Sequence, residues 1–208
     1  HAGSIFSGVL GTMADIVVAL FVAVYLAANP RVYTNGIVAL LPHRARPRAR
    51  EVLNELRRVL GLWILGKLLS MLVVGVATAI GLSLLGVPVA LALGLLASLL
   101  DFIPYIGSIL AAAPAVLIAF TQSPMLALEV SALFLAVHAL DGYVLLPLVE
   151  RKTVSLPPAL TISAQVLMGL AFGLGGVALA TPLTAVAEVL IQMLYVQDAL
   201  HDTRTPPA

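Results

Sequence analysis

Residues 88–120 read PVALALGLLASLLDFIPYIGSILAAAPAVLIAF and contain one charged side chain, Asp101. Pro104 and Gly107 follow closely, so the charge lies where the helix must break. Inside a bilayer every backbone N–H and C=O needs an internal partner, and a broken helix is tolerated only against protein or a water-filled cavity. An ionisable side chain at that depth is by default a functional candidate. The stretch therefore predicts a transport pathway through a membrane.

The composition of the whole chain is that of an integral membrane protein. Its 208 residues are 61% hydrophobic and 10% charged, with a mean hydropathy of +1.10, whereas a soluble domain has about 45–50% apolar and about 25% charged residues. The predicted fold is an all-α, polytopic membrane protein. The chain has no cysteine, which excludes disulfides, thiolate metal sites and cysteine nucleophiles. It begins at His1 without an initiator Met, and we expect further residues upstream.

Five apolar regions are long enough to cross or enter the hydrocarbon core, for which about 20 helical residues suffice. We expect one membrane domain, 1–208, with membrane helices at 5–28, 59–85 and 125–149, broken hairpins at 88–120 and 157–196, and a cytoplasmic tail at 197–208. Ser123-Pro124 has the pattern of an N-cap followed by a proline in the first helical position. Lys67, near the start of its region, is expected to extend to the membrane interface. Asp15 is either an oligomer contact or a pathway residue.

A polar insert at 31–58 separates the first two apolar regions and carries seven arginines. An excess of arginine marks the cytoplasmic side of a membrane protein. Val52, Leu56 and Val59 recur at helical spacing, which predicts an amphipathic helix that runs into the next span. The arginines either only set the topology or form an anionic-lipid patch or gating element.

The distribution of basic residues predicts that 88–120 enters the membrane and returns. With that hairpin, Arg151-Lys152 falls on the cytoplasmic side, and the loops at 86–88 and 121–124 carry no lysine or arginine. The same logic makes 157–196 a second hairpin that turns near Gly173–Gly176. Both hairpins contain Gly-x6-Pro, at Gly107–Pro114 and Gly175–Pro182. Such a pair is typical of inverted repeats, in which the binding site lies where the two tips meet.

Asp101 is the first candidate site residue, since a buried carboxylate can take up or release a coupling proton. Alternatively, it caps the helix break by accepting hydrogen bonds from the N–H groups of residues 103–105. Pro104 and Gly107 free backbone groups at the tip, and with Tyr105 these positions are expected to meet the cargo. In the second hairpin Gly175 is the corresponding position.

Further polar residues lie in the other apolar regions. His138 and Asp141 are three residues apart on one helix face and are expected to pair, either as a proton relay or to hold this helix against its neighbours. Glu188 and Gln165 are secondary candidates inside the second hairpin. Glu129 is expected to face water near the outer end of its helix.

Several of these stretches together resemble the autoinducer-2 exporter family, the PerM-like permeases of bacteria. The residues that carry the resemblance are Gly86-Val-Pro88, Asp101-Phe-Ile-Pro-Tyr-Ile-Gly107, Asp141-Gly-Tyr-Val-Leu-Leu-Pro147, Val154-Ser-Leu-Pro-Pro158 and the Gly173–Pro182 stretch. Two positions depart from the usual family pattern, Ser108 in place of proline and Tyr143 in place of asparagine. The resemblance implies a permease or exporter, autoinducer-2 or sodium exchanged for protons as cargo, and a homo-oligomer, with a pentamer as one form. This chain would be the C-terminal portion of a typical member.

The function predicted is transport of a small polar solute, autoinducer-2-like, coupled to H⁺ or Na⁺. The alternatives are a Na⁺/H⁺ antiporter and a non-transporting scaffold that oligomerises through small-residue faces such as Gly61–Gly66 and Gly94–Ala97. No protease or His-Glu-x-x-His motif is present, so we expect no enzyme, metal or cofactor. The expected partners are lipids, other copies of the chain and the solute or cation, and not nucleic acid. The expected location is the bacterial inner membrane, with the C-terminus in the cytoplasm.

Overall fold

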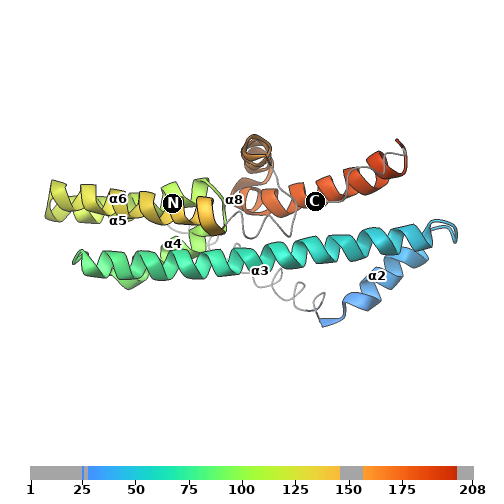
Figure 1. Ribbon diagram of the computed structural model, residues 1–208, viewed down its shortest axis with the longest axis horizontal. Coiled ribbons are helices and arrows are strands. Elements are labelled where there is room, and N and C mark those ends of the chain that lie inside the picture. Colours follow the sequence, from blue (N-terminus) through green and yellow to red (C-terminus); the bar gives the residue numbers. More distant parts are fainter. Residues whose placement is uncertain (1–24, 26–27, 146–156, 201–208) are drawn as a thin grey trace, which may run out of the picture. The chain divides into compact units, whose positions relative to one another are not determined.

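A computed structural model describes residues 25, 28–145 and 157–200. Within these ranges every regular element is a helix, which confirms the all-α fold (Figure 1). The elements are α2 (Pro30–Ala39), α3 (Arg46–Leu84), α4 (Ala90–Asp101), α5 (Ile106–Gln122), α6 (Pro124–Leu140), the π-helical turn η1 (Asp141–Leu145), α8 (Pro158–Leu190) and the π-helical η2 (Ile191–Gln197). The predictions for Asp15, for most of 5–28, for the end of 125–149, for Arg151-Lys152 and for 201–208 lie outside the described residues.

Three helices of the described part have the length and apolar composition needed to cross a membrane, α3, α6 with η1, and α8 with η2. The helices α4 and α5, with 12 and 17 residues, are also apolar. At 1.5 Å per residue they are about 18 and about 26 Å long. Each is shorter than the hydrocarbon core of about 30 Å.

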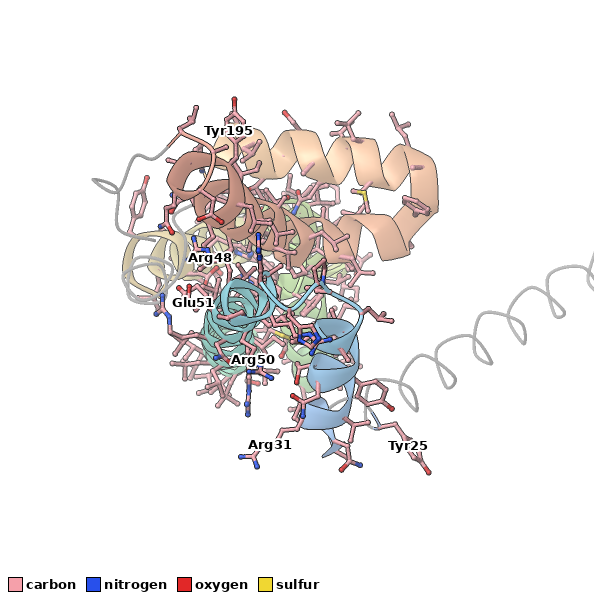
Figure 2. The ribbon with its side chains drawn as sticks, turned by 90° about the vertical axis from the view of Figure 1, so that its right-hand side faces the viewer. Tyr25, Arg31, Arg48, Arg50, Glu51 and Tyr195 are labelled. Carbon is pink, nitrogen blue, oxygen red and sulfur yellow. The ribbon has the colours of Figure 1, made fainter. Side chains whose placement is uncertain are left out.

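The chain divides into two compact units, and the boundary falls within α3 between Asn54 and Glu55. In the first unit the guanidinium of Arg46 donates to the carbonyls of Ala39 and Leu41, both at 3.1 Å, at the end of α2. Arg48 pairs with Glu51 at 2.8 Å, whereas Arg31 and Arg50 are exposed (Figure 2). At least one arginine of the insert therefore has a structural role, since a helix end leaves carbonyls without partners.

The core of the second unit is formed by α3, α4, α5 and α6, and α5 runs beside α6 (Figure 1). Small side chains supply much of it, as is usual where membrane helices approach closely. A Cβ atom on Gly94 of α4 would lie 2.8 Å from the carbonyl oxygen of Gly75 on α3. Ser123 accepts a hydrogen bond of 3.0 Å from the N–H of Leu126, which confirms the predicted cap of α6.

This packing corrects one alternative from the sequence. Gly94 and Ala97 were candidates for an oligomer contact, but both are buried within the chain, where Gly94 lies against α3. A scaffold could not use them as its outer face without opening this core. Gly61 has open space around it and keeps that possibility.

Two helix breaks interrupt the apolar helices of this unit. The first separates α4 from α5 at residues 102–105, where Tyr105 has a φ of 64°. A Cβ atom on Gly107 would lie 1.8 Å from the carbonyl oxygen of Leu100. Only glycine allows the start of α5 to approach the end of α4 this closely.

The second break lies within α8, where Gly173 has φ 65° and ψ −150°. A Cβ atom on Gly176 would lie 2.1 Å from the carbonyl oxygen of Met168, so the two arms are in backbone contact. Gly175 is exposed and has nothing near its Cβ position. The Gly-x6-Pro pattern equated Gly107 with Gly175. In the structure the counterpart of Gly107 is the next residue, Gly176.

Candidate functional site

A buried ion pair joins α3 to the first helix break. The ammonium of Lys67 lies 2.9 Å from Oδ2 of Asp101, and the two side chains are 12% and 6% exposed. The expectation that Lys67 extends to the interface is wrong. Lys67 lies on the face of α3 that also carries Ser70 and the buried Val74, so it points into the core. A charged pair this deep is maintained only when each charge has its partner.

Ser70 connects Asp101 to a second carboxylate. Its hydroxyl lies 2.9 Å from Oδ2 of Asp101 and also contacts Oδ1 of Asp141. Asp101 is the last residue of α4, and Asp141 is the first residue of η1. Three elements that are remote in sequence thus place an ammonium, a hydroxyl and two carboxyl groups together, and we call these residues the Asp101 cluster (Lys67, Ser70, Asp101 and Asp141).

The N–H groups at the helix break are bonded largely to the backbone. Those of Phe102 and Ile103 donate to the carbonyls of Leu99 and Leu100, at 3.3 and 3.0 Å, and those of Ile106 and Gly107 donate to the carbonyls of Pro104 and Ile103, at 2.8 and 3.0 Å. At these four positions Asp101 is not the cap, and its carboxylate bonds with Lys67 and Ser70.

The expected pairing of His138 with Asp141 does not form. Nδ1 of His138 donates to the carbonyl oxygen of Phe134 at 2.8 Å, and Nε2 is buried without a partner among the described residues. Asp141 instead contacts Ser70 of α3, so a contact between helices takes the place of the local pairing.

The tip of the first hairpin contacts an arm of the second hairpin. Nε2 of Gln165 on α8 donates to the carbonyl oxygen of Pro104 at 3.1 Å. Gln165 is fully buried, and its Oε1 has no partner among the described residues. Gln165 lies eight residues before Gly173, about 12 Å along the helix. The carbonyl of Pro104, which also accepts from the N–H of Ile106, therefore meets the arm at Gln165, and the expected meeting of the two tips is not the contact formed here.

The remaining predicted site residues lie apart from this cluster. Tyr105 is 42% exposed at the tip, and Gly175 is exposed at the second break. Glu188 is half-buried in α8, and its buried Oε2 has no partner within the described ranges. Of the eight residues predicted, the structure brings Asp101 and Asp141 into one hydrogen-bonded group.

Two members of the Asp101 cluster, Lys67 and Ser70, were not predicted. A signal for Lys67 was present, since an ionisable residue within an apolar span is a functional candidate whichever end it lies near. Ser70 follows it at i+3 and so shares its helix face. Among the described residues no group of three His, Cys, Asp or Glu side chains could hold a metal ion.

Comparison with known proteins agrees with the membrane fold and identifies the family. The sequence profile described as "AI-2E family transporter" matches residues 1–195. "Putative transport protein YueF" of Bacillus subtilis is 33% identical over 189 residues, which are 89% of this chain and 51% of that protein. "Putative permease PerM" of Escherichia coli K12 is 32% identical over 192 residues, 86% of this chain and 54% of that protein.

The chain spans about half the length of the curated relatives it matches. No solved structure matches it. The profile covers nearly the whole chain, and the relatives carry names of transport proteins and permeases. The chain belongs to the AI-2E family of transporters.

Proposed function

We propose that this chain forms the part of a permease that moves a small polar solute, coupled to H⁺ or Na⁺ through the Asp101 cluster. The observation that carries the proposal is the buried pair of Lys67 and Asp101 beside a helix break. Membrane helices that are broken near a charged group commonly frame the binding sites of transporters. A charge pair of this kind is expensive in an apolar interior, and its presence is best explained by a function.

The break supplies polar groups for a solute in addition to the charge. The carbonyl of Pro104 at this turn accepts from the N–H of Ile106 and from Gln165, and Oε1 of Gln165 is left as an acceptor without a partner among the described residues. A buried acceptor without a partner favours a ligand that donates hydrogen bonds, such as a hydroxyl-bearing solute. The family resemblance makes autoinducer-2 the first solute to test.

Coupling follows from the dependence of the ion pair on the charge of Asp101. While Asp101 is ionised, Lys67 is held to it; when Asp101 takes up a proton or a Na⁺, Lys67 loses its counter-charge and the contact between α3 and α4 weakens. Rocking of a hairpin against the rest of the protein would then alternate access to the site. Pro104, Tyr105 and Gly107 shape this path, and Gly175 and Glu188 lie along the second hairpin.

Further parts of the proposal rest on the sequence. The protein would lie in the bacterial inner membrane with its C-terminus in the cytoplasm, because the arginine-rich insert marks that side. It would act as a homo-oligomer, with a pentamer as one form. A Na⁺/H⁺ antiporter is the second candidate function, favoured by a cluster whose ligands are carboxylate and hydroxyl oxygens.

The test is flux through the intact protein in sealed vesicles with imposed H⁺ and Na⁺ gradients. Autoinducer-2 and Na⁺ are offered in turn, and the gradient-dependent part of the flux is measured. We expect Asp101→Asn to abolish that part while the protein still assembles. Glu129→Gln is the matched control, since Glu129 is an exposed acid on α6 outside the cluster. Unchanged coupled flux in Asp101→Asn would remove Asp101 from the mechanism, and the absence of flux of either species in wild type would favour the scaffold.

A further inference from the structure

We infer that the Asp101 cluster holds one exchangeable proton, which the hydroxyl of Ser70 carries between Asp141 and Asp101 and which one Na⁺ can replace. The inference rests on the proposed ion-coupled transport for its purpose. It is supported by the geometry of the cluster, which limits both the number of hydrogens that its contacts need and its total charge.

The contacts of Ser70 limit the protonation state of the two carboxyl groups. The oxygen of Ser70 lies within hydrogen-bonding distance of one carboxyl oxygen from Asp101 and one from Asp141. A hydroxyl has one hydrogen to donate, and an ionised carboxylate can only accept. Two ionised carboxylates would therefore leave one of these contacts without a hydrogen. The contacts are both satisfied when one carboxyl group is protonated and donates to Ser70.

The total charge of the cluster also favours one added proton. Lys67 contributes +1 and two ionised carboxylates contribute −2, so the cluster would carry −1, with Ser70 and Asp101 buried and Asp141 half-buried. One added proton brings the sum to zero, and burial of an uncompensated charge is strongly unfavourable. The contact of Lys67 with Asp101 makes Asp101 the ionised member and assigns the proton to Asp141.

Other ionisable groups on the packed helices leave this sum unchanged. The described part of α5 carries none, and α4 carries only Asp101. The imidazole of His138 is bonded to its own helix through Nδ1. The other charged groups on these helices are Glu129 on α6, Glu188 on α8 and, toward the start of α3, Arg46, Arg48, Arg50, Glu51, Glu55, Arg57 and Arg58. Of these, Arg48 pairs with Glu51 and Arg58 with Glu55 on α3 itself.

The arrangement permits a balanced transfer. The acid of Asp141 gives its proton to the oxygen of Ser70 while the hydroxyl of Ser70 gives its own hydrogen to Asp101. Ser70 is unchanged at the end, Asp101 is neutral and Asp141 is ionised. The negative charge has moved from α4 to η1, and Lys67 has lost its counter-charge on Asp101. A Na⁺ that replaces the proton leaves the total at zero, so the exchange is one for one.

The test measures proton release from the intact protein in weakly buffered nanodiscs with a pH-indicating dye. Addition of NaCl should release about one proton per chain, because the hydrogen count leaves one site to exchange. Choline chloride at the same concentration controls for ionic strength and should release none. Asp141→Asn should abolish the release and Glu129→Gln should preserve it. Ser70→Thr, which keeps the hydroxyl, should retain the release that Ser70→Ala loses.

Infrared spectroscopy gives a second readout that requires no transport. Wild type should show the C=O band of a protonated carboxylic acid that Na⁺ removes, and Asp141→Asn should lack that band. Absence of both the band and the Na⁺-dependent release in folded wild-type protein overturns the inference, even if coupled flux is observed. Release of a proton in a protein that shows no flux leaves the inference standing and overturns the proposed function.

Discussion

The two helix breaks of this chain share two backbone features and differ in chemistry. Each has one residue with a positive φ, Tyr105 in the first and Gly173 in the second. Each is followed by a glycine pressed against a carbonyl of the preceding arm, Gly107 on Leu100 and Gly176 on Met168. The first break lies directly after the carboxylate of a buried ion pair, whereas residues 171–175 at the second are exposed and uncharged.

The difference shows which residues are required to turn the chain. A helix can reverse in this protein with glycine alone, as it does at Gly173. Asp101 and its ion pair are therefore not needed to turn the chain. Because the buried charges contribute nothing to the turn itself, their cost is best explained by the proposed coupling.

The largest effect is expected from breaking the ion pair. Lys67→Met should lower the free energy of unfolding by about 3–5 kcal/mol, because it leaves the Asp101 carboxylate buried without its counter-charge. Thermal unfolding of the purified protein in detergent measures the change. No substitution at the second break should produce a loss of this kind, since residues 171–175 carry no charge.

A double-mutant cycle controls for the change in side-chain shape. Lys67→Met combined with Asp101→Leu removes both charges and should recover most of the lost stability, as replacement of buried ion pairs by apolar residues often does. Additive losses in the double variant would mean that the two residues do not stabilise one another.

Glycine substitutions come next and test whether the two breaks are equivalent. Gly107→Ala and Gly176→Ala should each cost about 1–3 kcal/mol or more, because the added methyl group overlaps a backbone carbonyl that cannot move aside freely. Gly175→Ala is the matched control and should change stability little, since its Cβ position is open. The fraction of protein that stays monodisperse after extraction, together with the unfolding temperature, measures the effect. A larger loss at Gly175 than at Gly176 would restore the equivalence drawn from the Gly-x6-Pro pattern.

Much of this architecture could be predicted from local sequence. The all-α membrane fold follows from composition, and the break after Asp101 follows from Pro104 and Gly107, whose effects on the backbone are local. The cap at Ser123 is a local signal of the same kind. Such features depend on residues that are neighbours in sequence, so a single sequence without an alignment is sufficient to recognise them.

The contacts between helices could not be predicted in the same way. Whether Lys67 turns inward depends on which face of α3 meets α4, and the apolar residues around it occur on all sides of that helix. Asp141 bonds with Ser70 of α3, a contact between helices that the local spacing does not encode, which is why the pairing with His138 was wrong. Gly175 and Gly176 are adjacent, and only the packing of the two arms of α8 decides which of them is crowded.

The smallest effect concerns the one position where the breaks differ in backbone strain. Tyr105 has a φ of 64°, a conformation that costs a residue with a side chain about 1–3 kcal/mol and costs glycine little. Tyr105→Gly gives the first break the residue type that the second break has at Gly173. Because glycine also gains freedom in the unfolded chain, we expect a net stabilisation of about 1 kcal/mol, measured as a rise in unfolding temperature. Gly173→Ala should do the reverse, and a loss of stability in Tyr105→Gly would show that the tyrosine ring contributes more at this tip than its backbone conformation costs.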